Sequence, residues 1–523
     1  MKLTKIILSA ALFASLSFIN SSYADSATWS LNPTSGDWNT AADWTPETIP
    51  NGSDQIATFA DSNQTLVNVS KPTEIGAIVF TPDAISYTIK IAPRKTLTIS
   101  GTGISNSSQV EQIFTETPGP FGLAGGSLQF MGSASADNAT INTSGGDSDS
   151  ALGGTTIFLD TSTAGSGTFN TTGTSAHAAQ AGLISFGGSS TAASGSFLNT
   201  GSSYSDFGEG AIMGFGESSS AATATITATA GEVPGAYGGQ TQFGGSSDAA
   251  AAVLIANGGA GFPGNIGFYQ TSSGGTARVE LSGDAYLSLD FHDPPGVTIG
   301  SLEGDGQVFL GANKLTVGAN NLDTAFSGII NGTGSLAKTG KGKLTLSGAN
   351  TYTGGTTISQ GTLRVSNTTG SATGTGAVSV TGGKLGGIGI IAGGTTIGPG
   401  NGAVAILEPS AGGKKPATLT IQSALDFKGA VFNYQLDTRR AQGDQVVANG
   451  VTIEEAGQFN FAAIANKSLG AGQVFIVISN TSATPISGTF SNLPDGSIFT
   501  AGRNSYQANY EGGDGNDLTL TVQ

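Results

Sequence analysis

The chain lacks cysteine and is poor in charged residues. None of its 523 residues is Cys and 11% are charged, against a charged share of about 25% in typical soluble proteins. Without disulfides, the folded state depends on burial and backbone hydrogen bonds. Acidic residues outnumber lysine and arginine by 36 to 20, giving a net charge of −16. Such a chain is not expected to bind nucleic acid or anionic membranes, because like charges repel.

Long apolar runs are also missing, with one exception at the N-terminus. Residues 1–24 have the organisation of a secretory signal: Lys2 and Lys5 come first, residues 6–19 are mostly apolar, and a small-x-small site ends at Ala24. The apolar run is shorter than the ~20 residues that cross a bilayer. We therefore expect cleavage after Ala24. The mature protein is then extracellular or held at the cell surface, and does not span the membrane.

Phenylalanine, by contrast, is plentiful, and some of the Phe residues recur at a nearly constant spacing. Six Phe residues follow one another at spacings of 28, 28, 29, 28 and 25 residues, each with a hydroxyl residue at plus three, small residues at plus six and plus nine, and a large apolar residue at plus eleven. The six are Phe130, Phe158, Phe186, Phe215, Phe243 and Phe268, with Ser133, Thr161, Ser189, Ser218, Ser246 and Thr271 at plus three and Ile141, Phe169, Phe197, Ile226, Leu254 and Val279 at plus eleven.

A period of this length indicates stacked units that bury their apolar faces against one another. Each unit holds two short segments rich in Phe, Ile, Thr and Val, broken by Gly, Ser and Ala before a helix could form. Residues at plus nine and plus eleven lie on one side of a strand. The repeat therefore predicts an all-β fold, a β-solenoid or parallel β-helix. Each Phe should stack on the next at about 4.8 Å, with the hydroxyl residues in a ladder at a corner.

The flanking sequences predict caps at both ends of the solenoid. We divide the mature chain into residues 25–125 (N-terminal cap and first coils), 126–290 (the six repeats), 291–425 (further coils) and 426–523 (a β-rich cap). Trp29, Trp38 and Trp44 are the only tryptophans and fall in the first part. They could form a carbohydrate-stacking platform, but we favour a cap, because terminal repeats must cover an open end.

One segment resembles a known family. Residues 335–365 read SLAKTGKGKLTLSGANTYTGGTTISQGTLRV, and residues 340–365 in particular resemble the autotransporter-associated β-strand repeat of secreted, passenger-type bacterial surface proteins. The resemblance implies a β-solenoid passenger outside the cell or at the outer membrane, often adhesive, with no catalytic residues to carry over. Proteins of that kind ordinarily end in a translocating barrel of some 12 strands. Residues 426–523 are too short for it at about 10 residues per strand, so we expect a chain without its own pore.

A single stretch is similar to a calcium-binding motif. Residues 512–517 read GGDGND, close to the nonapeptide of repeats-in-toxin proteins. Asp514 and Asp517 are the candidate ligands, since Ca²⁺ prefers carboxylate and carbonyl oxygens. That motif works in stacked copies, however, and here there is one, with Thr519 where a large apolar residue is expected. A Gly/Asn/Asp turn leading into the last strand is the interpretation we favour. No other cofactor is expected.

Residues suited to catalysis are sparse. The two histidines, His177 and His292, are far apart in sequence and are expected in a repeat turn and in a loop between solenoid segments. Residues 126–275 contain no Lys or Arg, and their acids do not recur at one offset. The alternative function, a polysaccharide lyase or glycosidase on this scaffold, needs clustered carboxylates or carboxylates with a base. The sequence therefore predicts a non-enzymatic structural or adhesive surface protein. Its expected partner is an extracellular surface, a polysaccharide or a ligand on another cell.

Overall fold

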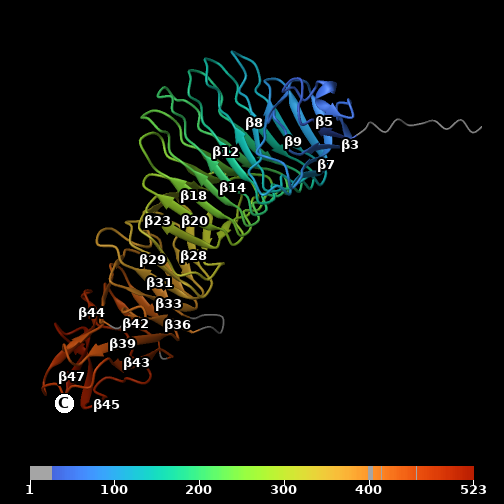
Figure 1. Ribbon diagram of the computed structural model, residues 1–523. Coiled ribbons are helices and arrows are strands. Elements are labelled where there is room, and N and C mark those ends of the chain that lie inside the picture. The colour runs from blue at the N-terminus through green and yellow to red at the C-terminus, as the bar shows by residue number, and fades with distance from the viewer. Residues whose placement is uncertain (1–25, 399–403, 414, 455) are drawn as a thin grey trace, which may run out of the picture.

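Short strands stacked along a single axis, together with the turns that connect them, make up nearly all of the described chain (Figure 1). The computed structural model describes residues 26–398, 404–413, 415–454 and 456–523, so the signal predicted at residues 1–24 lies outside the described residues. The helical element in these ranges is the 3₁₀ turn η1 (Ala41–Asp43). In the part of the chain that the structure describes, no helix is long and apolar enough to cross a membrane.

The first sheet forms one side of the stack over its N-terminal two thirds. After an antiparallel pairing of the first two strands, its neighbours are parallel and follow one another coil by coil. In hydrogen-bonding order the strands are β2 (Trp44–Thr45), β1 (Ala27–Trp29), β3 (Gly52–Phe59), β5 (Thr73–Phe80), β7 (Thr96–Asn106), β9 (Ser127–Phe130), β11 (Thr155–Phe158), β13 (Leu183–Phe186), β15 (Ile212–Phe215), β17 (Gln240–Phe243), β19 (Asn265–Phe268), β21 (Tyr286–Ser288), β24 (Gln307–Phe309) and β27 (Ile329–Asn331).

The second sheet forms another side and runs almost the full length of the stack. Its strands pair in parallel in the order β4 (Leu66–Val69), β6 (Thr88–Ile91), β8 (Ile113–Glu116), β10 (Thr140–Thr143), β12 (Thr168–Thr171), β14 (Ser196–Asn199), β16 (Thr225–Ala228), β18 (Val253–Asn257), β20 (Arg278–Ser282), β23 (Ser301–Gly304), β26 (Thr324–Phe326), β29 (Lys343–Leu346), β31 (Thr362–Val365), β33 (Gly383–Gly387), β36 (Ala405–Leu407), β39 (Val431–Asp437) and β43 (Gln458–Ala463). The short strand β40 (Gln442–Gly443) pairs antiparallel with β39.

Two further sheets cover the C-terminal part. The third sheet is parallel and orders β22 (Gly296–Ile299), β25 (Lys314–Val317), β28 (Ser335–Lys338), β30 (Thr356–Ile358), β32 (Val378–Val380), β35 (Thr395–Ile397), β38 (Leu425–Phe427) and β42 (Val451–Ile453). The fourth orders β34 (Ile390–Ile391), β37 (Thr418–Ile421), β41 (Gln445–Ala448), β44 (Val474–Asn480), β47 (Asp517–Val522), β46 (Asn504–Gly512) and β45 (Ile498–Ala501), and from β44 on its pairing is antiparallel.

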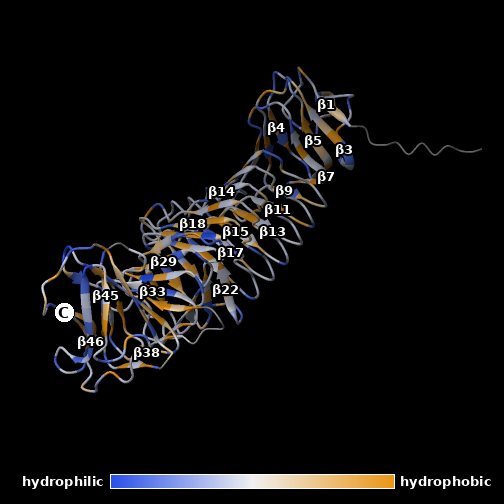
Figure 2. Cartoon of the chain, turned by 90° about the horizontal axis from the view of Figure 1, so that it is seen from below, coloured by the Kyte–Doolittle hydropathy of each residue, from blue (hydrophilic) through white to orange (hydrophobic). Residues whose placement is uncertain are grey.

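The predicted phenylalanine column is confirmed. The six Phe residues of the repeat are register partners in the first sheet, and neighbouring ring centroids lie 4.6 to 4.9 Å apart with planes within 11° of parallel. The plus-eleven residues form a second column in register inside the second sheet. Buried and partly exposed residues alternate along the repeat strands, as in β11 and β13, and Figure 2 shows apolar segments recurring along the stack. The all-β solenoid is the fold of this chain.

The hydroxyl residues at plus three lie at a solvent-exposed corner. Thr161 Oγ1 donates to the Gly132 carbonyl at 2.9 Å, and Thr271 Oγ1 donates to the Gly245 carbonyl at 2.8 Å. These two hydroxyls tie their corner to the coil before it, and the residues lie at a corner as the repeat predicted. One position further on, a second ladder of serines points into the core and was not foreseen: Ser162, Ser190, Ser219, Ser247 and Ser272.

A turn at plus two alternates between glycine and a residue with an acceptor side chain. All six residues there have positive φ: Gly132, Asp160, Gly188, Glu217, Gly245 and Gln270. The side chain in one coil accepts from the glycine amide one coil earlier, at 2.9 Å for Asp160 Oδ2 and 2.6 Å for Gln270 Oε1, with Glu217 doing the same to Gly188. The glycines avoid the strain that a side chain meets in this conformation. These three acceptor side chains therefore link the corners of neighbouring coils.

Both ends of the stack are covered, although by different means. At the N-terminal end the three indoles are buried and pack edge-to-face, with Trp44 centroids 5.0 Å from those of both Trp29 and Trp38. Because no indole face is open, the stacking-platform alternative for these tryptophans is wrong. At the other end, the antiparallel strands β44 to β47 close the core. The residue ranges assigned to the four parts stay predictions, since the sheets pass from one part to the next without a break.

Candidate functional site

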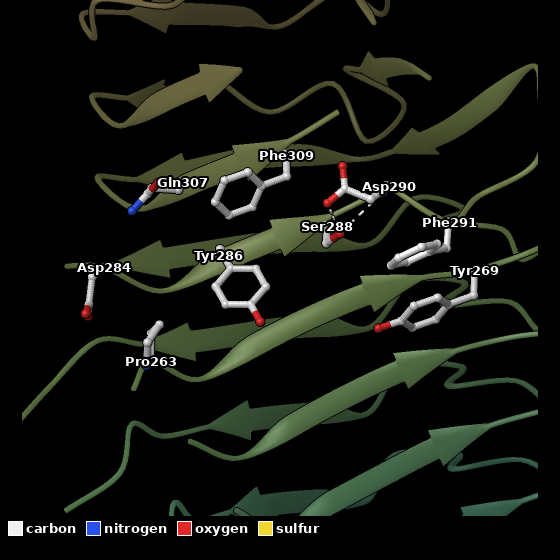
Figure 3. A pocket seen from close by; sticks show the side chains of 9 residues that line it. All are labelled: Pro263, Tyr269, Asp284, Tyr286, Ser288, Asp290, Phe291, Gln307 and Phe309. Atoms are coloured by element: carbon white, nitrogen blue, oxygen red, sulfur yellow. Dashed lines mark hydrogen bonds between the residues drawn. The ribbon is translucent and has the colours of Figure 1, made fainter. Parts of the chain in front are cut away.

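A cleft of about 560 Å³ opens on the outer face of the first sheet, where β19, β21 and β24 lie side by side (Figure 3). We call it the aromatic cleft, because four of its nine lining residues carry an aromatic ring. The lining residues are Pro263, Tyr269, Asp284, Tyr286, Ser288, Asp290, Phe291, Gln307 and Phe309. Its volume is within the ~300–1,000 Å³ common for small-molecule sites.

Strand register places two of the rings at the centre of the cleft. Tyr286 pairs with Gln307, and Ser288 pairs with Phe309. These residues face outward because their neighbours along each strand, such as Leu287 and Val308, are fully buried. The rings of Tyr286 and Phe309 meet edge-to-face with centroids 5.4 Å apart. In the three coils before β21 the same outer positions carry Asn, Gln, Ile or Gly rather than rings.

Two more rings stand on the side of the cleft nearest Asp290 (Figure 3). Tyr269 follows β19, and its ring lies where a side chain at Gly267 would stand, since a Cβ added there would be 2.6 Å from Tyr269 Oη. Phe291 is 75% exposed and its ring centroid lies 6.4 Å from that of Tyr269, with planes 16° apart. A missing side chain at Gly267 thus makes room for one wall of the cleft.

The turn that carries Phe291 is anchored by its neighbour. His292 is 8% exposed, and its Nε2 lies 2.7 Å from the Ser272 carbonyl. Asn313 Nδ2 donates to the His292 carbonyl at 2.9 Å. His292 therefore holds the loop between two coils, as the sequence indicated. His177 is an exposed residue in the connection between β12 and β13, in a repeat turn.

Oxygen atoms line the cleft between the rings. Asp284 and Asp290 stand at its opposite ends (Figure 3), and Ser288 Oγ donates to Asp290 Oδ2 at 3.1 Å. Burial, followed by the charge on Asp290, raises the pKa of Tyr269; burial, then Tyr269 and Asp290, raise the pKa of Tyr286. Both phenols are therefore neutral donors at physiological pH. No basic residue belongs to the lining.

A shallow groove of about 730 Å³ continues from the cleft toward the N-terminal coils. The two hollows share Tyr269 and Phe291. Gly187, Gly216 and Gly244 line the groove directly after their strands, and Gly214 lies on its floor with open space where a Cβ would stand. Small residues in consecutive coils therefore extend the cleft into a track across several strands of the first sheet.

A separate group of exposed rings lies on the loops between the two sheets. Phe207, Tyr237 and Phe262 stack, with centroids 4.9 Å apart for the last two and 6.3 Å apart for Phe207 and Phe262. Each ring belongs to a different coil, and Phe207 is 62% exposed. We call this group the loop aromatic cluster. It is not part of the aromatic cleft, and it provides a matched control for it.

The candidate calcium ligands lie at the other end of the molecule. GGDGND forms the hairpin turn between β46 and β47, where Gly512 pairs with Asp517. Asp517 is buried and its Oδ1 accepts from the Asn480 amide at 2.9 Å, while Asp514 is exposed. Burial and then Asp514 raise the pKa of Asp517, against the lowering effect of the Asn480 hydrogen bond. In the described ranges, no group of three or more His, Asp or Glu residues is arranged to hold a metal. Calcium binding by Asp514 and Asp517 stays a prediction.

Chelation tests that calcium prediction directly. If GGDGND is only a turn, EGTA should leave the melting temperature unchanged, because Asp517 already has a protein partner. The Asp514→Asn variant removes a candidate ligand at an exposed position and should melt like wild type with or without Ca²⁺. A fall in melting temperature on chelation that Asp514→Asn abolishes would establish the metal site instead. Differential scanning calorimetry measures both.

The fold and the cleft define a class of protein, a parallel β-solenoid with an open, aromatic-lined surface. The family description Passenger-associated-transport-repeat matches residues 336–365, a segment that begins in β28 and ends with β31. This match confirms the resemblance found in residues 340–365. No curated protein matches the chain.

Among solved structures, the crystal structure of the Haemophilus influenzae Hap adhesin is similar to this chain. The identity is 11% and the TM-score 0.25, and the alignment covers 90% of this chain and 64% of that chain. The present chain therefore spans less than two thirds of the length of that adhesin chain.

Proposed function

We propose that this chain is an exported, non-enzymatic adhesive protein that is displayed outside the cell and binds an extracellular surface, a polysaccharide or a ligand on another cell. The observation that carries the proposal is the passenger-associated repeat at residues 336–365, which lies within the solenoid itself. The aromatic cleft adds support, since rings that line a hollow of about 560 Å³ together with a few polar groups are typical of ligand sites. The solenoid presents this surface on a rigid scaffold.

The placement of charged groups supports a binding role over a catalytic one. A glycosidase needs two carboxylates about 5–10 Å apart across one bond, and a lyase needs a base near the substrate. In the aromatic cleft, Asp284 and Asp290 stand at opposite ends with no basic residue in the lining. In the repeats, Asp160 and Glu217 are engaged with glycine amides of neighbouring coils. Asp160 and Glu217 thus stabilise corners of the solenoid, whereas Asp284 and Asp290 line one cleft without a basic residue beside them.

Adhesion of coated beads tests this function. Beads carrying the secreted chain should be retained on source cells, on cultured animal cells or on polysaccharide-coated wells several-fold more than beads carrying albumin. Protease treatment of intact source cells should digest the protein, as expected for surface display. Retention no greater than that of albumin on every surface would contradict the proposal. Full protection of the protein inside intact cells would contradict it as well.

A further inference from the structure

We infer that the aromatic cleft is a subsite for a neutral oligosaccharide chain, bound by stacking on Tyr269, Phe291, Tyr286 and Phe309 and by hydrogen bonds to the acids and amides between them. This inference rests on the proposed adhesive function, for which it names the site and the class of ligand. Three properties of the cleft carry it: where its rings occur along the solenoid, the chemistry of its lining, and its continuation into the groove.

The rings appear where the repeat pattern changes. Along the first sheet, the outer position paired with Phe309 is Gly267 and Ser288 in the two preceding coils, and Gly214 and Gln242 before those. The exposed Phe291 and the inward-pointing His292 share one turn. Stacking of the coils does not require these four rings, because they lie on the outer face of the sheet and not in the core. Half-exposed rings that stand together are instead what a ligand with flat apolar faces requires.

The lining selects among ligands that have flat apolar faces. A pyranose ring presents C–H faces to aromatic rings and hydroxyl groups at its rim, and here the rim would meet Asp284, Asp290, Gln307 and Ser288. Carboxylates are strong acceptors for sugar hydroxyls. A nucleotide, a uronate chain or a sulfated glycan would bring negative charge against two carboxylates with no basic group in the lining, on a chain of net charge −16. Charge therefore favours a neutral sugar.

The shape favours a chain over a single sugar. The cleft of about 560 Å³ extends from Asp284 at one end to Asp290, Phe291 and Tyr269 at the other (Figure 3). A ligand that reaches both ends must be elongated. The groove that shares Tyr269 and Phe291 continues the same track over Gly216 and Gly244, where the absence of side chains leaves room for further sugar units.

Calorimetric titration tests the subsite on the full secreted chain. Gluco-, manno- and galacto-configured neutral hexasaccharides serve as probes, with oligogalacturonate as the anionic comparison. We expect at least one neutral probe to bind and oligogalacturonate to bind at least tenfold more weakly. Phe291→Ala and Tyr286→Ala should each weaken binding of the neutral probe by about tenfold or more, which corresponds to ~1.4 kcal/mol. Phe207→Ala, in the loop aromatic cluster, should bind like wild type.

The outcomes separate the subsite from the wider function. If no neutral probe binds, or if Phe291→Ala and Tyr286→Ala bind as well as wild type, the subsite assignment fails even when coated beads still adhere. If the neutral probe binds in the cleft but beads are not retained on any surface, the subsite stands and the adhesive function fails. Gly267→Val offers a second check, because it should displace the Tyr269 ring and weaken binding without altering any ring itself.

Discussion

Replacing Phe186 by Ala is expected to lower the free energy of unfolding by about 3–5 kcal/mol, as truncation of a buried aromatic residue does. Phe186 is buried, with Phe158 at 4.6 Å and Phe215 at 4.8 Å between ring centroids, and Phe197 of the second sheet meets it edge-on at 5.9 Å. The substitution therefore interrupts the column at its middle. Chemical denaturation monitored by circular dichroism measures the change.

The damage should also be local, because each coil of a solenoid contacts only its neighbours. Hydrogen exchange of Phe186→Ala should rise in β11, β13 and β15 and stay near wild type in β31 and β33. Phe207→Ala is the control, since that ring is mostly exposed, and it should change stability little. A Phe186→Ala protein as stable as wild type, or one that exchanges uniformly faster along its length, would contradict the stacked-coil description.

Stability should fall as the pH rises from about 5 to about 8, and Glu116 is expected to be a main cause. Its side chain points into the core from β8 and is fully buried. Burial raises the pKa of Glu116 to about 8, an effect only partly offset by hydrogen bonds that include those to Thr143 and Thr156. Thr156 Oγ1 donates to Glu116 Oε1 at 3.2 Å, and among the described residues Glu116 Oε2 has no hydrogen-bond partner.

The sign follows from proton uptake. Above pH 4.5 the unfolded chain has lost this proton, whereas the folded protein keeps it up to about pH 8. The folded state therefore binds more protons in this interval, and the free energy of unfolding decreases with rising pH. The stabilisation is fully present below pH 4.5 and is lost as the pH rises through the folded pKa. The change over the interval is ~5 kcal/mol at most.

The Glu116→Gln variant isolates this contribution. Glutamine keeps an acceptor for Thr156 but cannot ionise, so the variant should lose most of the decline and should exceed wild type in stability at pH 8. A smaller decline should remain, because burial also raises the pKa of Asp444 to about 6. Glu111→Gln, at an exposed residue of the same segment, is the control and should follow the wild-type pH dependence. Parallel pH profiles of denaturation for wild type and Glu116→Gln would show that Glu116 does not titrate as described.

The solenoid could be predicted from sequence because its main constraint is periodic. One column of Phe and one of plus-eleven residues determine the strand register, and both were visible as fixed offsets. The structure also explains why the spacing between successive Phe residues varies. The extra residues lie in the corners and loops, while stacking and backbone pairing keep the register of residues such as Phe158 and Phe186. The passenger-type segment was likewise readable, because its motif is contiguous.

The aromatic cleft could not be predicted in the same way. Its rings come from two strands, β21 and β24, and from the two connections that follow β19 and β21, and each one looks like an ordinary apolar residue of a strand-rich sequence. Only the register, which pairs Tyr286 with Gln307 and Ser288 with Phe309, shows that they share an outer face. A shorter repeat, 25 residues before Phe268, together with four rings between residues 269 and 309, was the available signal. The burial of Glu116 could not be predicted for a related reason. Whether a strand residue points inward depends on its place in the alternation of inward and outward side chains, which the sequence around Glu116 does not determine.

Binding of a polysaccharide without cleavage is the central claim to test. The most direct test is to incubate the purified protein with immobilised neutral polysaccharides and to measure retained protein and released products in the same wells. We expect protein to be retained, with no reducing ends or unsaturated sugars above background after long incubation, and Phe291→Ala to be retained less. Release of such products by wild type, abolished in Asp290→Asn, would contradict the adhesive function and establish a carbohydrate-active enzyme on this solenoid.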